Sequence, residues 1–184
     1  RVGRPVKWTC ERSEAFLSDY QGRDLVAKVE LALDEKGKFL AIRGSHLSNI
    51  GGYAASIVPL RKGLTICTNV YKIPLAHYRA YAVLSNTMCT IPYRSAGRPE
   101  AVYLMERLCD LAADKTGIDR VTIRRRNLIP PKDLPYRTAL GTKYDNGEYE
   151  QAMDTAITIS DWKEFAKRRR ESRKLGKLRG IGLA

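Results

Sequence analysis

A loop of ten residues, 91–100, places the strongest limits on how this chain can fold, because it must turn an extended segment directly into the best-patterned helix of the sequence. Its two prolines fix the backbone torsion φ, whereas the Ser-Ala-Gly stretch at 95–97 lets the backbone approach a ligand closely. Arg94 and Arg98 flank these small residues with permanent positive charge. Because Pro99 suits the first turn of a helix, free backbone N–H groups are expected beside the two guanidinium groups. The loop is therefore a candidate cradle for an anion or cofactor, or a surface loop whose arginines are solvated.

Upstream of this loop, after an extended or loop segment, the sequence predicts a β-hairpin. Apolar residues alternate with other residues from 27 to 33, and Asp-Glu-Lys-Gly at 34–37 supplies the turn. A return strand runs from Phe39 to Asn49, where two glycines interrupt it. The sequence then predicts a short helix or irregular connection at residues 53–63. Two more strands should follow, at residues 66–71 and 78–84.

Downstream of the loop the sequence predicts helices. The principal helix should run from Pro99 to Thr116, with Gly117 as its stop. Its buried stripe should consist of Val102, Met105, Leu108, Cys109 and Ala112.

Three further segments complete the predicted fold. Asp119 should cap a short helix that ends with an Arg-Arg-Arg run at 124–126, which would lie on the surface or reach a bound anion. A proline-rich loop, a helix at 148–159 and a basic helix at 162–179 follow; Asp161 and Glu164 should cap the basic helix, and residues 179–184 should begin a strand. Because strands precede helices, the predicted class is α+β, a hairpin-rich mixed sheet followed by packed helices.

Length and composition favour a globular protein without a metal site of its own. The 184 residues, 43% of them hydrophobic, suit a single domain or a fragment of a larger one. No apolar run has the length of a membrane span, so we expect no membrane association and a cytoplasmic location. The four cysteines are widely spaced without a Cys-x-x-Cys pair, and only two histidines occur, so we expect reduced, mostly buried thiols rather than zinc or iron–sulfur ligands.

The net charge of +13 raises the question of a nucleic-acid or acidic protein partner. Much of it lies at 163–179, where nine basic residues face two glutamates, a balance of 9 − 2 = +7. No nucleic-acid motif accompanies this stretch and aromatic residues are not interleaved with it, so nucleic-acid binding is disfavoured. A solvated face or a contact with an acidic protein partner remains open.

Several motifs, in the right order along the chain, resemble one enzyme family. Residues 93–100, Tyr-Arg-Ser-Ala-Gly-Arg-Pro-Glu, are similar to the cofactor loop of the molybdenum hydroxylases, the large subunits of the xanthine dehydrogenase, aldehyde oxidase and carbon monoxide dehydrogenase family. Further similar segments lie at residues 3–8, 21–23, 46–49, 71–74, 85–87 and 124–128. The resemblance spans nearly the whole chain.

The resemblance implies part of a molybdopterin-binding domain whose molybdenum–pterin cofactor hydroxylates a substrate with oxygen from water. It implies electron transfer to iron–sulfur clusters and FAD on partner subunits, an iron–sulfur small subunit and an FAD-binding medium subunit. It also implies a catalytic role for Arg94 beside the metal. The cofactor-binding residues it implies are Tyr93, Arg94, Ser95, Ala96, Gly97 and Arg98.

The resemblance also bears on the substrate. Ser95 matches a cysteine that holds copper in carbon monoxide dehydrogenases, and Ala96 matches a phenylalanine that stacks on the substrate in xanthine oxidase-like members. We therefore expect an aldehyde or N-heteroaromatic substrate. Other family site elements, including the catalytic glutamate, fall outside these residues, so the 184 residues alone should be inactive. The alternatives are a non-catalytic assembly module or a nucleic-acid or acidic-partner binding domain that uses the helix at 162–179.

Overall fold

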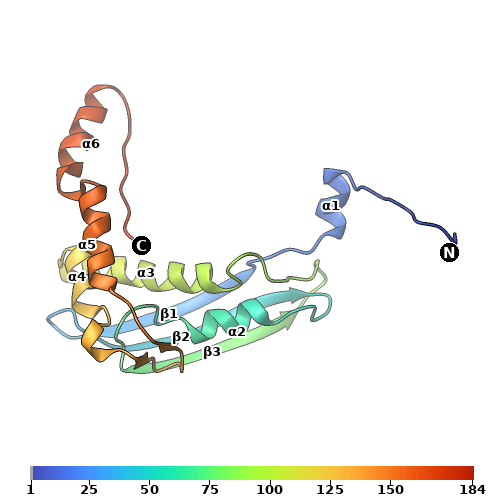
Figure 1. The fold of residues 1–184 in the computed structure, drawn as a ribbon, viewed down its shortest axis with the longest axis horizontal. Helices are drawn as coiled ribbons and strands as arrows, with labels where there is room; N and C mark the ends of the chain where they lie inside the picture. Colours follow the sequence, from blue (N-terminus) through green and yellow to red (C-terminus); the bar gives the residue numbers. More distant parts are fainter. Residues whose placement is uncertain (1) are drawn as a thin grey trace.

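The structure, a computed structural model that describes residues 2–184, is built on a three-stranded mixed sheet. β1 (Leu25–Leu33) and β2 (Phe39–Gly51) form an antiparallel pair, and the Asp34 carboxylate accepts the backbone N–H groups of Lys36 and Lys38 in the turn. β3 (Leu75–Leu84) then pairs with β2 in parallel (Figure 1). The hairpin prediction is confirmed, including the continuation of β2 to the glycines.

A crossover helix, α2 (Val58–Thr65), connects β2 to β3, as a parallel pair requires. The strand predicted at 66–71 is wrong. These residues form turns, with Asn69 in the left-handed region at φ +49° and Tyr71 in a single bridge to Leu128. Their apolar side chains gave a strand-like pattern because Cys67 and Tyr71 point into the core from a loop.

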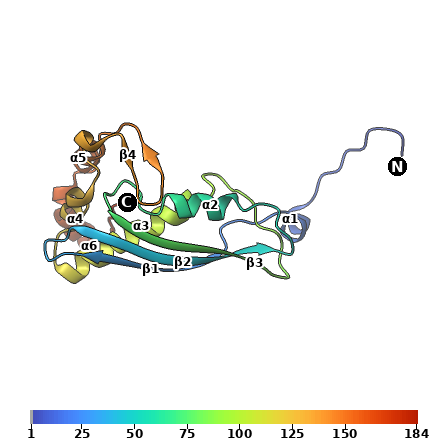
Figure 2. The same cartoon turned by 90° about the horizontal axis from the view of Figure 1, so that it is seen from below.

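In the part of the chain that the structure describes, the helices α2 and α3 cover one face of the sheet (Figure 2). The long helix α3 (Arg98–Thr116) packs on β1, and α2 packs on β3. On the opposite face Val26, Leu47 and Tyr81 are exposed and lie in register across the three strands. The hydrophobic core therefore lies on the helix side alone.

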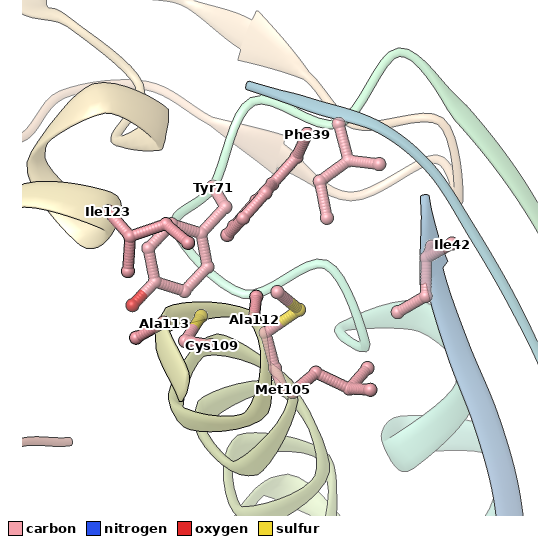
Figure 3. Packing of buried hydrophobic residues seen from close by; sticks show 10 residues of the cluster. Phe39, Ile42, Tyr71, Met105, Cys109, Ala112, Ala113 and Ile123 are labelled. Atoms are coloured by element: carbon pink, nitrogen blue, oxygen red, sulfur yellow. The ribbon is translucent and has the colours of Figure 1, made fainter. Parts of the chain in front are cut away.

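The core joins α3 to the hairpin and to the loop before β3. Met105 and Cys109 are fully buried on α3, and Figure 3 shows them facing the rings of Phe39 and Tyr71. The predicted stripe of α3 is confirmed except at Val102, which is only half-buried. The thiols are free and three of the four are buried, as expected.

The C-terminal part extends away from the sheet before the chain returns (Figure 1). It begins with α4 (Arg120–Asn127), where Asp119 accepts the Thr122 backbone N–H at 2.9 Å, as predicted. The remaining elements are η1 (Pro131–Asp133), β4 (Tyr136–Arg137), β5 (Lys143–Tyr144), α5 (Tyr149–Ile159), η2 (Trp162–Glu164) and α6 (Phe165–Lys174). At the other end of the chain, a short helix α1 (Arg12–Ser18) replaces part of the expected extended segment.

Two predictions for the basic stretch are wrong. Asp161 and Glu164 do not cap α6, because Asp161 adopts a left-handed conformation and pairs with Arg168, and the Glu164 side chain makes no cap hydrogen bond. Within the described residues, 179–184 form no strand; instead the Leu183 carbonyl accepts a hydrogen bond from Arg124. The helix α6 buries only Ser172, so its basic side chains are largely exposed, and their role in binding a partner stays a prediction.

Within residues 2–184, no helix combines the length and the apolar character that crossing a membrane requires.

Candidate cofactor loop

The loop that precedes α3 is a compact double turn. Ser95, Ala96 and Gly97 follow one another at φ +69°, +40° and +91°, all in the left-handed region. The Ala96 N–H donates to the Tyr93 carbonyl at 2.8 Å, and the Arg98 N–H donates to the Ser95 carbonyl at 3.1 Å. Two non-glycine residues with positive φ are uncommon, and such conformations persist only where surrounding contacts hold them.

This geometry leaves fewer free N–H groups for binding an anion than the sequence predicts. The Ala96 and Arg98 N–H groups are used inside the loop, and the Arg98 guanidinium folds back to the Ser95 carbonyl at 3.4 Å. Free backbone donors are therefore fewer than the sequence predicts. Arg94 is exposed, so its guanidinium remains available to a ligand.

Gly97 fixes the loop against α2. A β-carbon at Gly97 would lie 2.1 Å from the Pro59 carbonyl oxygen and 2.7 Å from the Gly63 nitrogen. Gly97 is itself buried, whereas Tyr93, Arg94, Ser95 and Arg98 are exposed and Ala96 is half-buried. The structure thus gathers the predicted residues in one loop but leaves Gly97 a shaping role rather than an exposed contact.

The segment at 21–23 holds the other side of the loop. Gln21 donates its N–H to the Cys89 carbonyl at 3.1 Å and accepts the Ile91 N–H at 2.9 Å. The Arg23 guanidinium donates to the Arg94 carbonyl at 2.7 Å. Arg23 belongs to a motif that resembles the family, but nothing in its local sequence indicates a contact with a residue 71 positions away.

A buried polar side chain of β2, that of His46, lies beside the start of α3. His46 is 4% exposed, and its Nδ1 lies 3.5 Å from the Tyr78 hydroxyl. Its Nε2 and the Glu100 Oε2 have no hydrogen-bond partner among residues 2–184. Both residues line an enclosed space of about 10 Å³ together with Cys67. Burial lowers the pKa of His46 below its ordinary 6.5, and the charge of Glu100 partly offsets this effect.

The lowered pKa of His46 predicts that stability falls on acidification. Below about pH 6.5 the unfolded chain binds a proton at His46 that the folded protein resists, so the free energy of unfolding should decrease as the pH falls. His46→Gln should remove this dependence below about pH 6.5. Urea unfolding at a series of pH values tests it, with the exposed His77→Gln as a matched control. Equal pH profiles for the wild type and His46→Gln would contradict the assignment.

Comparison with known proteins agrees with the resemblance seen in the sequence motifs. A family model described as the molybdopterin cofactor-binding domain matches residues 1–128. The chain is 31% identical over 189 residues to the gamma subunit of the 6-hydroxypseudooxynicotine dehydrogenase complex of Paenarthrobacter nicotinovorans, covering 99% of this chain and 24% of the relative. It is 35% identical over 190 residues to the carbon monoxide dehydrogenase large chain of Hydrogenophaga pseudoflava, with the same coverage of 99% and 24%.

Solved structures agree with this result. Quinoline 2-oxidoreductase from Pseudomonas putida 86 superposes with a TM-score of 0.87 at 30% identity, over 95% of this chain and 23% of that one. The chain thus spans about a quarter of the length of the relatives it matches.

Proposed function

Because the chain belongs to the molybdopterin cofactor-binding domain family of the molybdenum hydroxylases, we propose that residues 93–98 contact the molybdenum–pterin cofactor in a complete large subunit. The observation that carries the proposal is the exposed Arg94 on a loop that three neighbouring segments restrain: α2, residues 21–23 and the start of α3. A permanently charged guanidinium on a restrained loop suits an anionic cofactor, since electrostatic stabilisation is strongest when the charge needs little reorganisation.

When bound, the cofactor would supply the redox chemistry, namely hydroxylation of a carbon centre with oxygen from water. The residues of this chain would supply position and charge. Arg94 would hold positive charge beside the reacting centre, the small side chains of Ser95 and Ala96 would let the cofactor approach, and Gly97 would keep the loop on α2. The activity belongs to the complete subunit, because one loop offers only part of such a site.

The substrate we propose is an aldehyde or an N-heteroaromatic compound. Ser95 presents a hard hydroxyl oxygen where copper would need a thiolate, which argues against a copper-dependent reaction. The small side chain of Ala96 leaves room where a phenylalanine would stack on a purine. The quinoline oxidoreductase, one of the similar structures, is named for an N-heteroaromatic compound, which supports this class.

The proposal extends to partner subunits and location. The names of the relatives, a large chain and a complex subunit, support an assembly with further subunits. We propose that these are an iron–sulfur small subunit and an FAD-binding medium subunit, in a cytoplasmic enzyme. Purification of the complete complex followed by metal, pterin and flavin analysis tests this composition.

Arg94→Ala in the complete enzyme is expected to lower turnover by about 100-fold, because a charge-assisted contact in such a site contributes about 2 to 4 kcal/mol to transition-state stabilisation. Steady-state kinetics on aldehydes and N-heteroaromatic compounds measures the effect. Arg43→Ala, which removes an exposed arginine that pairs with Glu30 on the sheet, is the matched control and should leave turnover unchanged. Wild-type turnover in Arg94→Ala would mean that this guanidinium faces solvent.

A further inference from the structure

We propose that Arg23 is a positioning residue that fixes the backbone of Tyr93 and Arg94 and thereby aims the Arg94 side chain. This inference rests on the proposed function of the loop. Arg23 contacts the loop in its middle and at its end, although it lies far away in the sequence. It therefore restrains the loop as a unit rather than one side chain of it.

The shortest of these contacts is to the backbone. Arg23 Nη2 donates to the Arg94 carbonyl oxygen at 2.7 Å, a distance typical of a strong N–H···O bond. The carbonyl is part of the same residue whose guanidinium is exposed. Holding the carbonyl fixes the peptide plane of Arg94, and so limits the directions that its side chain can take.

Arg23 makes two further contacts, one with the Tyr93 ring and one with the Glu100 carboxylate. The Arg23 guanidinium carbon lies 4.9 Å from the centre of the Tyr93 ring, within the range of a cation–π interaction. Arg23 Nε lies 3.6 Å from Glu100 Oε1, at the start of α3. Glu100 is 12% exposed, and its charge offsets the repulsion expected between Arg23 and the other arginines of the loop.

The backbone of Arg23 indicates that this placement is imposed by tertiary structure. Arg23 adopts φ +58°, a conformation that a non-glycine residue rarely takes without external restraint. The restraints lie on both sides, since Gln21 pairs with Cys89 and Ile91 and β1 begins at Leu25. The side chain is thereby directed to the loop.

The chemistry of the side chain favours arginine over lysine at this position. Only a planar guanidinium can donate to the Arg94 carbonyl, face the Tyr93 ring and approach the Glu100 carboxylate with different nitrogens. An ammonium group is a point charge without this fork. Arg23→Lys should therefore keep the charge but lose part of the restraint.

The test uses the complete holoenzyme and compares Arg23→Ala, Arg23→Lys and the control Arg43→Ala. Hydrogen–deuterium exchange of peptides that cover residues 89–97 reports loop restraint directly, and steady-state kinetics separates kcat from KM. We expect faster exchange in these peptides and a kcat about 10-fold lower for Arg23→Ala, with unchanged molybdenum and pterin content and a smaller effect in the same direction for Arg23→Lys. Arg43→Ala should match the wild type in both measurements.

The outcomes distinguish this inference from the function on which it rests. Wild-type enzyme without molybdenum and pterin would refute the proposed function itself. A cofactor-loaded wild type, with wild-type exchange and kcat in Arg23→Ala, would overturn only the role of Arg23. If Arg23→Ala does not fold, Arg23→Lys decides: faster exchange and lower kcat support the role, and wild-type values for both overturn it.

Discussion

Arg124→Ala is expected to lower the free energy of unfolding by about 3 to 5 kcal/mol, because it leaves a buried carboxylate without its counter-charge. Arg124 is 2% exposed, and its Nε donates to Glu106 Oε2 at 2.7 Å. Its Nη2 donates to Asp110 at 3.0 Å and to the Leu183 carbonyl at 3.1 Å. Such a loss is a large share of the roughly 5 to 15 kcal/mol that stabilises a typical protein.

The ion pair belongs to a larger buried network between α3 and α4. Glu106 also accepts the Tyr71 hydroxyl at 2.8 Å and the Asn69 side-chain amide at 3.3 Å. Burial alone would lower the pKa of Arg124, but the hydrogen bond and the charge of Glu106 outweigh burial and raise it. Removing either charged partner therefore disturbs several hydrogen bonds at once.

Arg125 is the matched control on the same helix. It pairs with Glu150 and Asp154, but these carboxylates are more than half exposed. Arg125→Ala should cost about 0.2 to 1 kcal/mol, as is usual for surface ion pairs. Denaturant unfolding of the purified variants measures both values, and the double variant Glu106→Gln with Arg124→Met should be less destabilised than Arg124→Ala. Equal losses for Arg124→Ala and Arg125→Ala would contradict the assigned burial.

The contrast between Arg124 and Arg125 also shows which parts of the fold could be predicted from the sequence alone. Local patterns were sufficient for the hairpin, for α3 and for the Asp119 cap, because alternation, helical spacing and capping are properties of neighbouring residues. Three consecutive arginines look alike in the sequence, whereas their burial depends on how α4 lies against α3. The failed strand at 66–71 has the same cause, since its apolar residues enter the core from turns.

The candidate site was predictable in composition but not in geometry. The small residues, the prolines and the arginines of the loop are visible in the sequence. Positive φ at Ser95 and Ala96 accompanies hydrogen bonds inside the loop that occupy its backbone donors, and the link to Arg23 comes from a distant segment. The hydrogen bond from Arg23 to Arg94 joins residues 71 positions apart, and no local sequence pattern encodes a contact at that separation.

Gly97→Ala is expected to destabilise the protein by about 2 to 5 kcal/mol and to displace the cofactor loop. Two costs add here. A residue with a β-carbon is destabilised by about 1 to 2 kcal/mol in the left-handed region, which Gly97 occupies at φ +91°. Overpacking typically costs about 1 to 3 kcal/mol more, and the contact is severe because the added carbon would lie 2.1 Å from the Pro59 carbonyl oxygen, which belongs to backbone and cannot rotate away.

Gly117→Ala separates the two costs. Gly117 ends α3 at φ +72°, but an added β-carbon there meets no atom within 4 Å, so the substitution carries only the conformational term of about 1 to 2 kcal/mol. Denaturant unfolding measures the loss in the free energy of unfolding for each variant. The loss in Gly97→Ala minus the loss in Gly117→Ala isolates the contact between the loop and α2. In the complete enzyme Gly97→Ala should also lower cofactor content, whereas Gly117→Ala should not. Losses of equal size in the two variants would mean that α2 does not support the loop, and that the restraint on Arg94 comes from Arg23 and its neighbours alone.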